Sequence, residues 1–227
     1  MLRKHIVFDG SDTDDPRSRA IVQETALLCT RLLTSPQGGV IGTGGRLGFV
    51  APLDSEDALV VAANVAFHLV RQGRRIALVE GDLRHPRLAD ACGEAATPGF
   101  SELLQGVATI AQLPVWARLP QLVAVPAGVL HAAPLSLDDR ALDSALQAID
   151  RTADTALVAL PRLLATPEAL LLAQRMDAVV LVVRANTTGR RDVERSAALI
   201  AELGVPLVGT VLTSVDHVMP VSLESRL

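Results

Sequence analysis

The chain contains no tyrosine. Only 2% of its 227 residues are aromatic, namely four phenylalanines and one tryptophan. A protein that phosphorylates its own tyrosines needs an acceptor hydroxyl of that kind. Autophosphorylation on tyrosine is therefore excluded within these residues.

Cysteine is also scarce. Cys29 and Cys92 are the two cysteines, 63 residues apart, and neither a C-x-x-C motif nor a histidine pair at ligand spacing accompanies them. The sequence therefore predicts neither a zinc site nor a disulfide framework. A reduced, cytoplasmic setting is expected.

Long apolar runs and a strong excess of one charge are missing too. No run reaches the roughly 18 residues that read as a membrane-spanning helix, and the net charge of −4 gives no broad basic surface for nucleic acid. We expect no nucleic-acid partner and contact with a membrane only through a partner protein. The expected location is cytoplasmic, with a peripheral position at the inner membrane as the alternative.

Short apolar runs alternate with helical patterns along the chain, which predicts an α/β fold: a doubly wound, mainly parallel sheet with helices on both faces. Expected strands cover 47–52, 75–80, 121–126, 155–160, 178–184 and 206–213. Expected helices cover 19–33, 56–72, 100–113, 136–151, 165–174 and 189–203. We divide the chain into residues 1–34, a flexible segment with an amphipathic helix, and residues 35–227, a single domain.

Residues 47–69 have the outline of a strand, a phosphate-binding loop and a helix. Such a loop needs glycines whose backbone N–H groups point inward, a lysine for the terminal phosphates and a Ser/Thr hydroxyl for Mg²⁺. The corresponding residues are Asp54, Ser55, Glu56, Asp57, Ala58, Leu59 and Val60. Neither the lysine nor the metal-binding hydroxyl is present, and carboxylates stand where phosphates would lie.

Several ordered segments carry a family resemblance. They are Asn64-Val65-Ala66, the run EGDLRHPRL (80–88), TPGFSELLQGVATI (97–110), VAVPAG (123–128) and residues 177–213. Together they resemble the bacterial tyrosine kinases of capsule and exopolysaccharide export, relatives of the chromosome-partitioning and septum-positioning ATPases. The resemblance implies a P-loop NTPase-like fold.

The departures from that family pattern define the functional expectation. The family's phosphate-loop glycines fall on Ser55 and Asp57, its lysine on Ala58, and its hydroxyl on Leu59 or Val60. Its metal-associated aspartate falls on Ala159, and its adenine-reading asparagine on Thr213. The sequence is therefore similar to a family member with degenerate nucleotide-binding motifs.

Magnitudes indicate that the nucleotide site is lost. A micromolar site is worth about −8 kcal/mol, each lost charge-assisted hydrogen bond gives up roughly 1.5–3 kcal/mol, and a carboxylate beside a phosphate adds up to about 4 kcal/mol of repulsion. We expect no bound cofactor and no metal, with ATP and Mg²⁺ as the alternative.

The remaining charged candidates lie in the 80–88 run. Glu80 and Asp82 could form an oxygen-ligand cluster with Asp54 or Asp57, but we prefer them as solvated carboxylates at a strand end, with Asp82 capping the turn before Pro86. For Arg84 and Arg87 the sequence leaves two interpretations open. In one they contact a partner, and in the other they form ion pairs with Glu80 and Asp82.

The predicted function is a catalytically inactive kinase-like subunit that binds or regulates a membrane polysaccharide co-polymerase in exopolysaccharide biosynthesis and export. Its expected partner is that co-polymerase or an active kinase homologue, and a homo-oligomer is an option. The family's helix motif for ring assembly, E-x-x-R-x-x-R, matches only at Glu24, with Leu27 and Thr30 at the arginine positions. Two alternatives remain: an ATPase or kinase with an atypical phosphate loop, and a degenerate positioning ATPase of division or motility.

Overall fold

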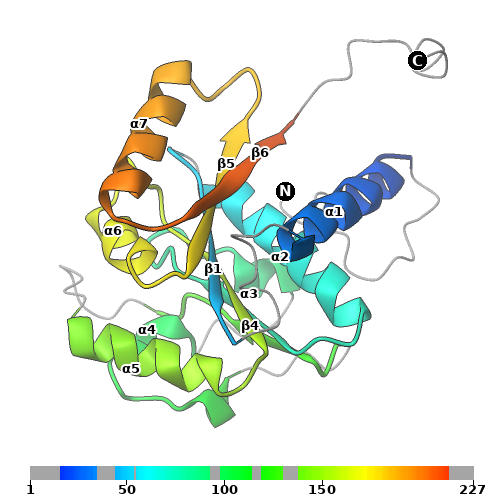
Figure 1. The fold of residues 1–227 in the computed structure, drawn as a ribbon. Coiled ribbons are helices and arrows are strands. Elements are labelled where there is room, and N and C mark those ends of the chain that lie inside the picture. Colours follow the sequence, from blue (N-terminus) through cyan, green and yellow to red (C-terminus); the bar gives the residue numbers. More distant parts are fainter. Residues whose placement is uncertain are drawn as a thin grey trace.

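A six-stranded parallel sheet forms the centre of the computed structural model, which describes residues 16–34, 44–53, 55–92, 98–113, 119–129 and 138–214. The strands are β1 (Arg46–Val50), β2 (Ile76–Glu80), β3 (Leu122–Val125), β4 (Thr155–Ala159), β5 (Ala178–Arg184) and β6 (Leu207–Thr213). Their order is β3-β2-β4-β1-β5-β6, and every neighbouring pair is parallel. The predicted doubly wound α/β fold is confirmed (Figure 1).

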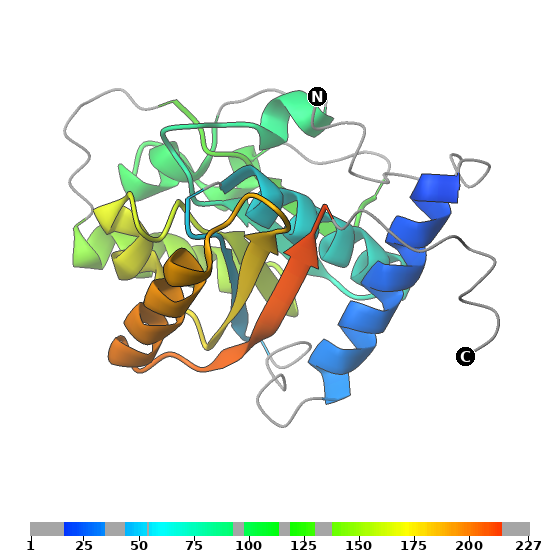
Figure 2. The same ribbon diagram turned by 90° about the horizontal axis from the view of Figure 1, so that it is seen from above.

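Helices cover both faces of this sheet. They are α1 (Pro16–Thr34), α2 (Ser55–Arg71), α3 (Leu88–Cys92), α4 (Phe100–Leu104), α5 (Asp139–Asp150), α6 (Pro167–Ala173) and α7 (Arg190–Glu202), with a 3-10 turn at Ile110–Gln112. One core cluster holds residues of α1, α2 and α3, and a second holds residues of α4, α5, α6 and α7. The view from above shows α1 and α2 on one side of the sheet and α5, α6 and α7 on the other (Figure 2).

Alternation along the strands divides their side chains between the two clusters. In β2, Ile76 and Leu78 belong to the first cluster, whereas Ala77 and Val79 belong to the second. Successive side chains of a strand point to opposite faces, so a strand covered on both faces must be apolar throughout. This explains why the inner strands read as unbroken apolar runs.

The helix expected over 100–113 is wrong as a single element. The structure has α4 at Phe100–Leu104, then a turn, then the 3-10 turn at Ile110–Gln112. Gly106 adopts a φ of 69° and its N–H donates to the carbonyl of Leu103. A left-handed glycine at this point ends a helix without steric cost. Helix α3 was not expected, because five residues are too few for a periodic pattern.

Helix α1 confirms the amphipathic helix expected over 19–33. Cys29 and Leu32 are buried in the first core cluster, where α1 packs against α2. Burial raises the pKa of the Cys29 thiol to about 12, so this cysteine remains protonated at neutral pH. Glu24 and Leu27 lie on the exposed side of the helix. The proposed division at residue 34 stays a prediction.

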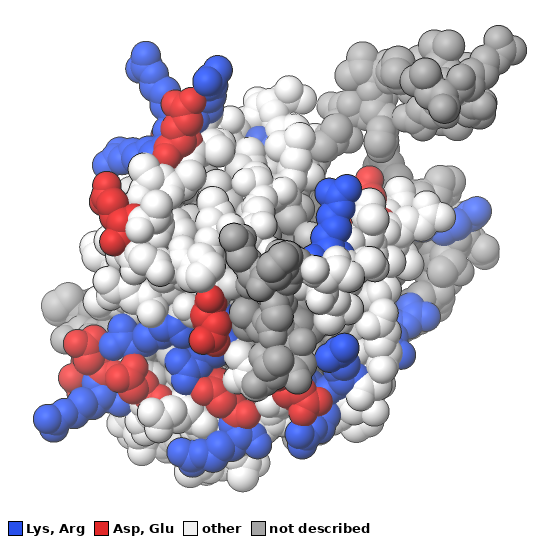
Figure 3. All heavy atoms as spheres, in the orientation of Figure 1, with Lys and Arg blue, Asp and Glu red and all other residues white. Residues whose placement is uncertain are grey.

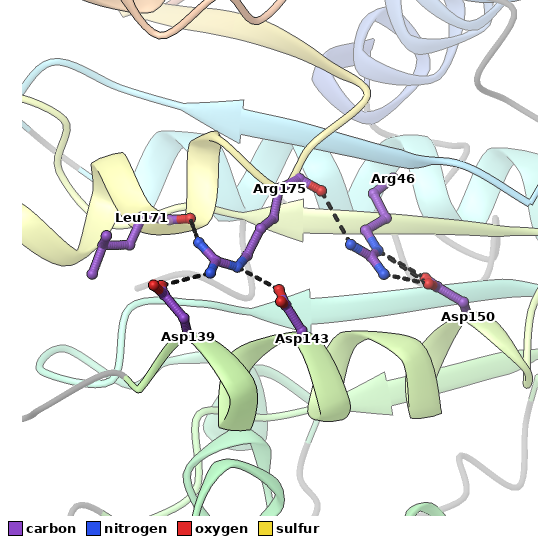
Figure 4. Close-up of polar contacts among 6 residues, drawn as sticks. All are labelled: Arg46, Asp139, Asp143, Asp150, Leu171 and Arg175. Carbon is purple, nitrogen blue, oxygen red and sulfur yellow. Dashed lines mark hydrogen bonds and ion pairs between the residues drawn. The ribbon is translucent and has the colours of Figure 1, made fainter.

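Two arginines fix α5 at the amino end of the strands (Figure 4). Arg46 opens β1, and its Nε and Nη2 donate to the carboxylate of Asp150 at distances of 3.1 and 2.5 Å. Arg175 donates to Asp139 at 2.6 Å and to Asp143 at 2.7 Å, while its own carbonyl accepts from Arg46. We call this group the α5 clasp. The view of Figure 3 shows both signs of charge interleaved around α5 and α6.

Candidate functional site

The segment aligned with the phosphate loop is helical. Helix α2 begins at Ser55, directly after β1 and the short run 51–54, so the positions of the family's glycines lie within its first turn. Asp54 lies outside the described residues, as do the side chains of Ser55 and Glu56. Backbone N–H groups in a helical turn point along the helix axis, whereas a phosphate cradle needs them to converge on one point.

The residues that the sequence resemblance aligns with the lysine and the hydroxyl belong to the hydrophobic core. Ala58 is fully buried and Leu59 is 3% exposed, and both pack in the first core cluster, with Val60 partly buried against it. A lysine at position 58 would bring an ammonium group into apolar surroundings, which is costly without a counter-ion. These positions therefore serve packing.

Asp57 is bound by groups at the ends of β5 and β6, which are neighbouring strands at one side of the sheet. Its carboxylate accepts from Arg184 Nε at 2.8 Å, from Arg184 Nη2 at 2.5 Å and from Thr213 Oγ1 at 2.6 Å. Arg184 ends β5 and Thr213 ends β6. We call this group the Asp57 knot. A bidentate guanidinium and a hydroxyl satisfy most of the carboxylate's hydrogen-bonding capacity. The negative charge of Asp57 therefore lies at the carboxyl ends of β5 and β6 and is paired there with Arg184.

Glu80 ends β2 and corrects one expectation, because it is not solvated. Its side chain is 2% exposed. Its Oε1 accepts from the backbone N–H groups of Arg87 at 2.6 Å and Leu88 at 3.0 Å, and its Oε2 accepts from that of Ala127 at 3.1 Å. Burial raises the pKa of Glu80 to about 7, outweighing these three donors, which lower it. Glu80 thus joins the turn after β2 to the segment after β3.

Asp82 is also buried, at 5% exposure, so the solvated interpretation is wrong for it as well. The predicted cap is confirmed: its Oδ1 accepts from the backbone N–H groups of Arg84 at 3.1 Å and His85 at 3.2 Å. The imidazole Nδ1 of His85 lies 3.3 Å from both carboxylate oxygens. A short polar side chain that binds the N–H groups two and three residues later is typical of a turn.

Arg84 has a different partner from the two that the sequence suggested. Its Nη2 lies 2.6 Å from Oε1 of Glu168, the buried carboxylate in the first turn of α6. Arg87 is exposed, and its contact with Glu80 comes from the backbone N–H. A contact of either arginine with a partner stays a prediction.

Ala159 ends β4, between its neighbours Phe49 of β1 and Glu80 of β2 in register. It is 3% exposed. That this residue stands at the position of the family's metal-associated carboxylate stays a prediction from the sequence. Next to it, the N–H of Gly81 donates to the Ala159 carbonyl at 2.8 Å, and a Cβ at residue 81 would lie 2.9 Å from that oxygen. Only glycine permits this close approach.

No group of three or more His, Cys, Asp or Glu side chains suited to a metal ion occurs among the described residues. This finding covers Asp57, Glu80 and Asp82 but not Asp54. In the same part of the chain, no helix is both long and apolar enough to cross a bilayer.

Two features of this edge were missed at the level of sequence. One is the ion pair of Asp57 with Arg184, which is 127 residues away in the sequence. The available signal was that Arg184 ends an otherwise apolar strand. The other is Arg162, which follows β4 and approaches His85 with Nη2 to Nε2 at 3.5 Å. Nothing in the local pattern of residues 160–164 pointed to it.

Comparison by sequence finds that bacterial tyrosine-protein kinases are similar to this chain. Tyrosine-protein kinase CpsD of Streptococcus agalactiae is 23% identical over 173 residues, covering 75% of this chain and 76% of that protein. The putative tyrosine-protein kinase EpsB of Ralstonia solanacearum is 27% identical over 158 residues, covering 69% of this chain and 21% of that longer protein. No protein-family model matches the chain.

Solved structures agree on the fold. The kinase domain of Escherichia coli tyrosine kinase ETK superposes with a TM-score of 0.80 at 19% identity, covering 95% of this chain and 83% of the other. The Pyrococcus furiosus cell division ATPase MinD superposes with a TM-score of 0.65 at 20% identity, covering 79% and 77%. The fold is that of the P-loop ATPases. Within that class, the homologues of this chain are bacterial tyrosine-protein kinases.

Proposed function

We propose that this protein is a catalytically inactive, kinase-like subunit that binds or regulates a membrane polysaccharide co-polymerase in exopolysaccharide biosynthesis and export. The homologous kinases support the choice of system, and the structure of the phosphate-loop segment supports inactivity. The main observation is that Ala58 and Leu59 lie in the core while Asp57 is bound by Arg184 and Thr213.

Three functions of a phosphate site have no residue to perform them in this segment. In the alignment that we propose, a helical turn that begins at Ser55 stands in place of a nest of N–H groups and Ala58 stands in place of the lysine. In the same alignment Ala159, at the end of β4, stands in place of the metal-associated carboxylate. Lysine is nearly absent from the whole chain, with Lys4 as its single instance.

The partner side of the proposal draws on exposed residues. Glu24 lies on the exposed side of α1, and Arg87 on the exposed turn after β2. Each is free to meet a co-polymerase, an active kinase homologue or a second copy without opening the core. Pull-down from membranes with Glu24→Arg and with the unchanged chain tests this: we expect weaker capture by the variant and an unaltered melt. Equal capture excludes Glu24 as part of the contact.

Titration with Mg-ATP tests inactivity. We expect the melting temperature to remain unchanged by millimolar Mg-ATP or Mg-ADP. Binding would be easy to detect, because a ligand at 100 times its dissociation constant adds about 2.7 kcal/mol of stability. A saturable rise of several degrees, together with hydrolysis of ATP, contradicts the proposal and favours an ATPase with an atypical loop.

Repair of the loop gives a second measurement. The triple variant Asp57→Gly, Ala58→Lys, Leu59→Ser restores the family residues, yet we expect little ATPase activity from it because Ala159 still supplies no metal-associated carboxylate. Robust hydrolysis by the triple variant would show that the second acidic position lies elsewhere in the chain.

A further inference from the structure

Strand β6 has a neighbouring strand on one side only, among the residues that the structure describes. It is the last strand in the sheet order, and β5 is its partner. The carbonyl of Thr213 accepts from the N–H of Ala185, on the β5 side, at 2.9 Å. Successive residues of a strand direct their backbone groups to opposite sides. The N–H and C=O groups of Thr210 and Leu212 therefore point away from β5, and we call this row of groups the free side of β6.

The free side of β6 lacks most of the features that protect such a row. Natural proteins use charged side chains, proline, a very short strand or a bulge for this purpose. Strand β6 has seven residues, LVGTVLT, with no charge and no proline. Its bulge lies at Val208, near the amino end, and residues 209–213 pair regularly with β5. The opposite border strand, β3, has four residues and is followed by Pro126. Of the two border strands, β6 is thus the one open to pairing.

The side chains of β6 are exposed and uncharged. Leu212 is 55% exposed, and Gly209 and Thr210 are exposed as well. Val211 is partly buried against the first core cluster. Figure 3 shows mainly uncharged atoms in the area of β5 and β6, with charged side chains on α7 beside it. A strand without charge can lie against a copy of itself without placing like charges opposite each other.

The charges of α7 favour a second copy in antiparallel orientation. This helix connects the end of β5 to the start of β6, so it runs opposite to both strands. It begins with Arg190 and Arg191 and ends with Glu202. If two copies of β6 pair antiparallel, their α7 helices lie on the same face of the joined sheet and run in opposite directions. The basic end of each helix is then on the side of the acidic end of the other, and such complementarity selects one orientation.

The register follows from which residues have their backbone groups on the free side. Antiparallel pairing centred on Val211 sets Thr210 of each copy opposite Leu212 of the other, so these outward groups bond across the two-fold axis. Centring on Thr210 would involve the bulge at Val208. Centring on Leu212 would involve Ser214, whose φ of 54° takes it out of the strand. Val211 is thus the centre that uses the regular part of β6 alone.

We propose that two copies of this chain form a dimer by antiparallel pairing of β6 with β6 about a two-fold axis at Val211. The two Val211 residues face each other as a non-hydrogen-bonded pair, because their own N–H and C=O groups bond to β5. Pairing occupies the free side of both copies, so the assembly closes at two chains. The proposal does not rest on the proposed function, because it uses neither the phosphate-loop segment nor Glu24.

Light scattering and sedimentation of the full chain over a concentration series test the dimer. We expect the mass to rise from 23.9 kDa toward twice that value in the micromolar range. Leu212→Lys places a charge from each copy beside the pairing and should weaken dimerisation at least tenfold. Leu53→Lys is the matched control: it makes the same change at a side chain that is 52% exposed and follows β1, and it should leave the dimer intact.

Val211→Cys tests the register. The Cα atoms of a non-hydrogen-bonded antiparallel pair are about 4.5 Å apart, within the range that a disulfide spans, so mild oxidation should link two copies through this residue. Gly209→Cys is the control, because residue 209 lies opposite Thr213 of the other copy and about 13 Å along the strand from its own counterpart. No atom lies within 4 Å of a Cβ at residue 209, so the substitution fits. The unchanged chain gives the background from Cys29 and Cys92.

Thermal melts check that the variants are folded, and Thr210→Lys replaces Leu212→Lys if that variant unfolds. A chain that stays monomeric up to about 1 mM disproves the dimer. A dimer that both lysine variants leave intact, or one that Val211→Cys does not link, disproves pairing through β6 in this register. A monomer whose Thr210 and Leu212 amide hydrogens are protected from exchange overturns the proposal in favour of residues 215–227 of the same chain. Binding of Mg-ATP by the dimer would count against the proposed inactivity and not against this interface.

Discussion

Glu80 combines near-complete burial with three backbone donors. In an unfolded chain its pKa would lie near the ordinary 4.5, whereas burial raises it to about 7 in the folded protein. Between these two values the folded state binds more protons at Glu80 than the unfolded state. The stability contributed by this group is therefore present at low pH and is lost as pH rises toward 7.

This shift predicts a pH-dependent difference between the unchanged chain and Glu80→Gln. Subtracting the free energy of unfolding of the variant from that of the unchanged chain cancels the other titrating groups. We expect the difference to fall by about 3 kcal/mol between pH 4 and pH 8, since each pKa unit corresponds to about 1.4 kcal/mol. Urea unfolding across that range measures it, and a difference that rises with pH would contradict the raised pKa.

Asp57 gives a second prediction for a single residue. Asp57→Asn keeps the shape of the side chain but removes the charge that Arg184 and Thr213 contact, so we expect a loss of roughly 1–3 kcal/mol in the free energy of unfolding. Chemical denaturation measures this loss. Glu194→Gln, which removes the partner of Arg190 in an ion pair with side chains 90% and 60% exposed, is the control and should cause no measurable change.

At the scale of elements, the α5 clasp connects a helix to the amino end of the sheet. Arg46 and Asp150 are 18% and 26% exposed, so water screens their pair only in part. Arg175 holds the first half of the same helix through Asp139 and Asp143. The two arginines thus set the position of α5 along its length, while its apolar residues set its distance from the sheet.

Arg46→Gln should therefore destabilise the protein by about 1–2 kcal/mol, because a bidentate, half-buried pair is lost and the carboxylate of Asp150 remains. Arg190→Gln is the matched control: it removes the same kind of charge from an exposed pair and should leave the urea midpoint unchanged. Similar losses in both variants would show that burial of the clasp adds nothing.

The elements that the sequence predicted well are those defined by side-chain pattern. Residues 178–184 are apolar up to Arg184, and β5 covers that range. The burial of Glu80 escaped prediction because its partners are backbone N–H groups, which every residue except proline carries and which leave no mark in the sequence. The partner of Asp57 escaped for another reason: it is set by strand order, which brings residues 127 apart together.

At the scale of the whole molecule, the amino and carboxyl ends of the strands form two edges of the sheet, and these two edges carry different groups. The amino edge carries the α5 clasp, an ion-pair network between elements. The carboxyl edge carries the Asp57 knot over one half and Asp82, His85 and Arg162 over the other. Parallel sheets place ligand sites at the carboxyl edge. The proposed loss of ATP binding thus concerns the edge at which this class of sheet ordinarily binds its ligands.

Strand β6 borders the sheet and pairs with β5 alone, and its residues are half-buried or exposed. Local unfolding begins where few apolar contacts hold the backbone, so β6 is the first candidate for transient opening. Its last residue, Thr213, also holds Asp57 in the first turn of α2. Opening of the strand would release that turn, and the amide hydrogens of both segments should exchange with solvent at a common rate, although Asp57 and Thr213 are 156 residues apart in the chain.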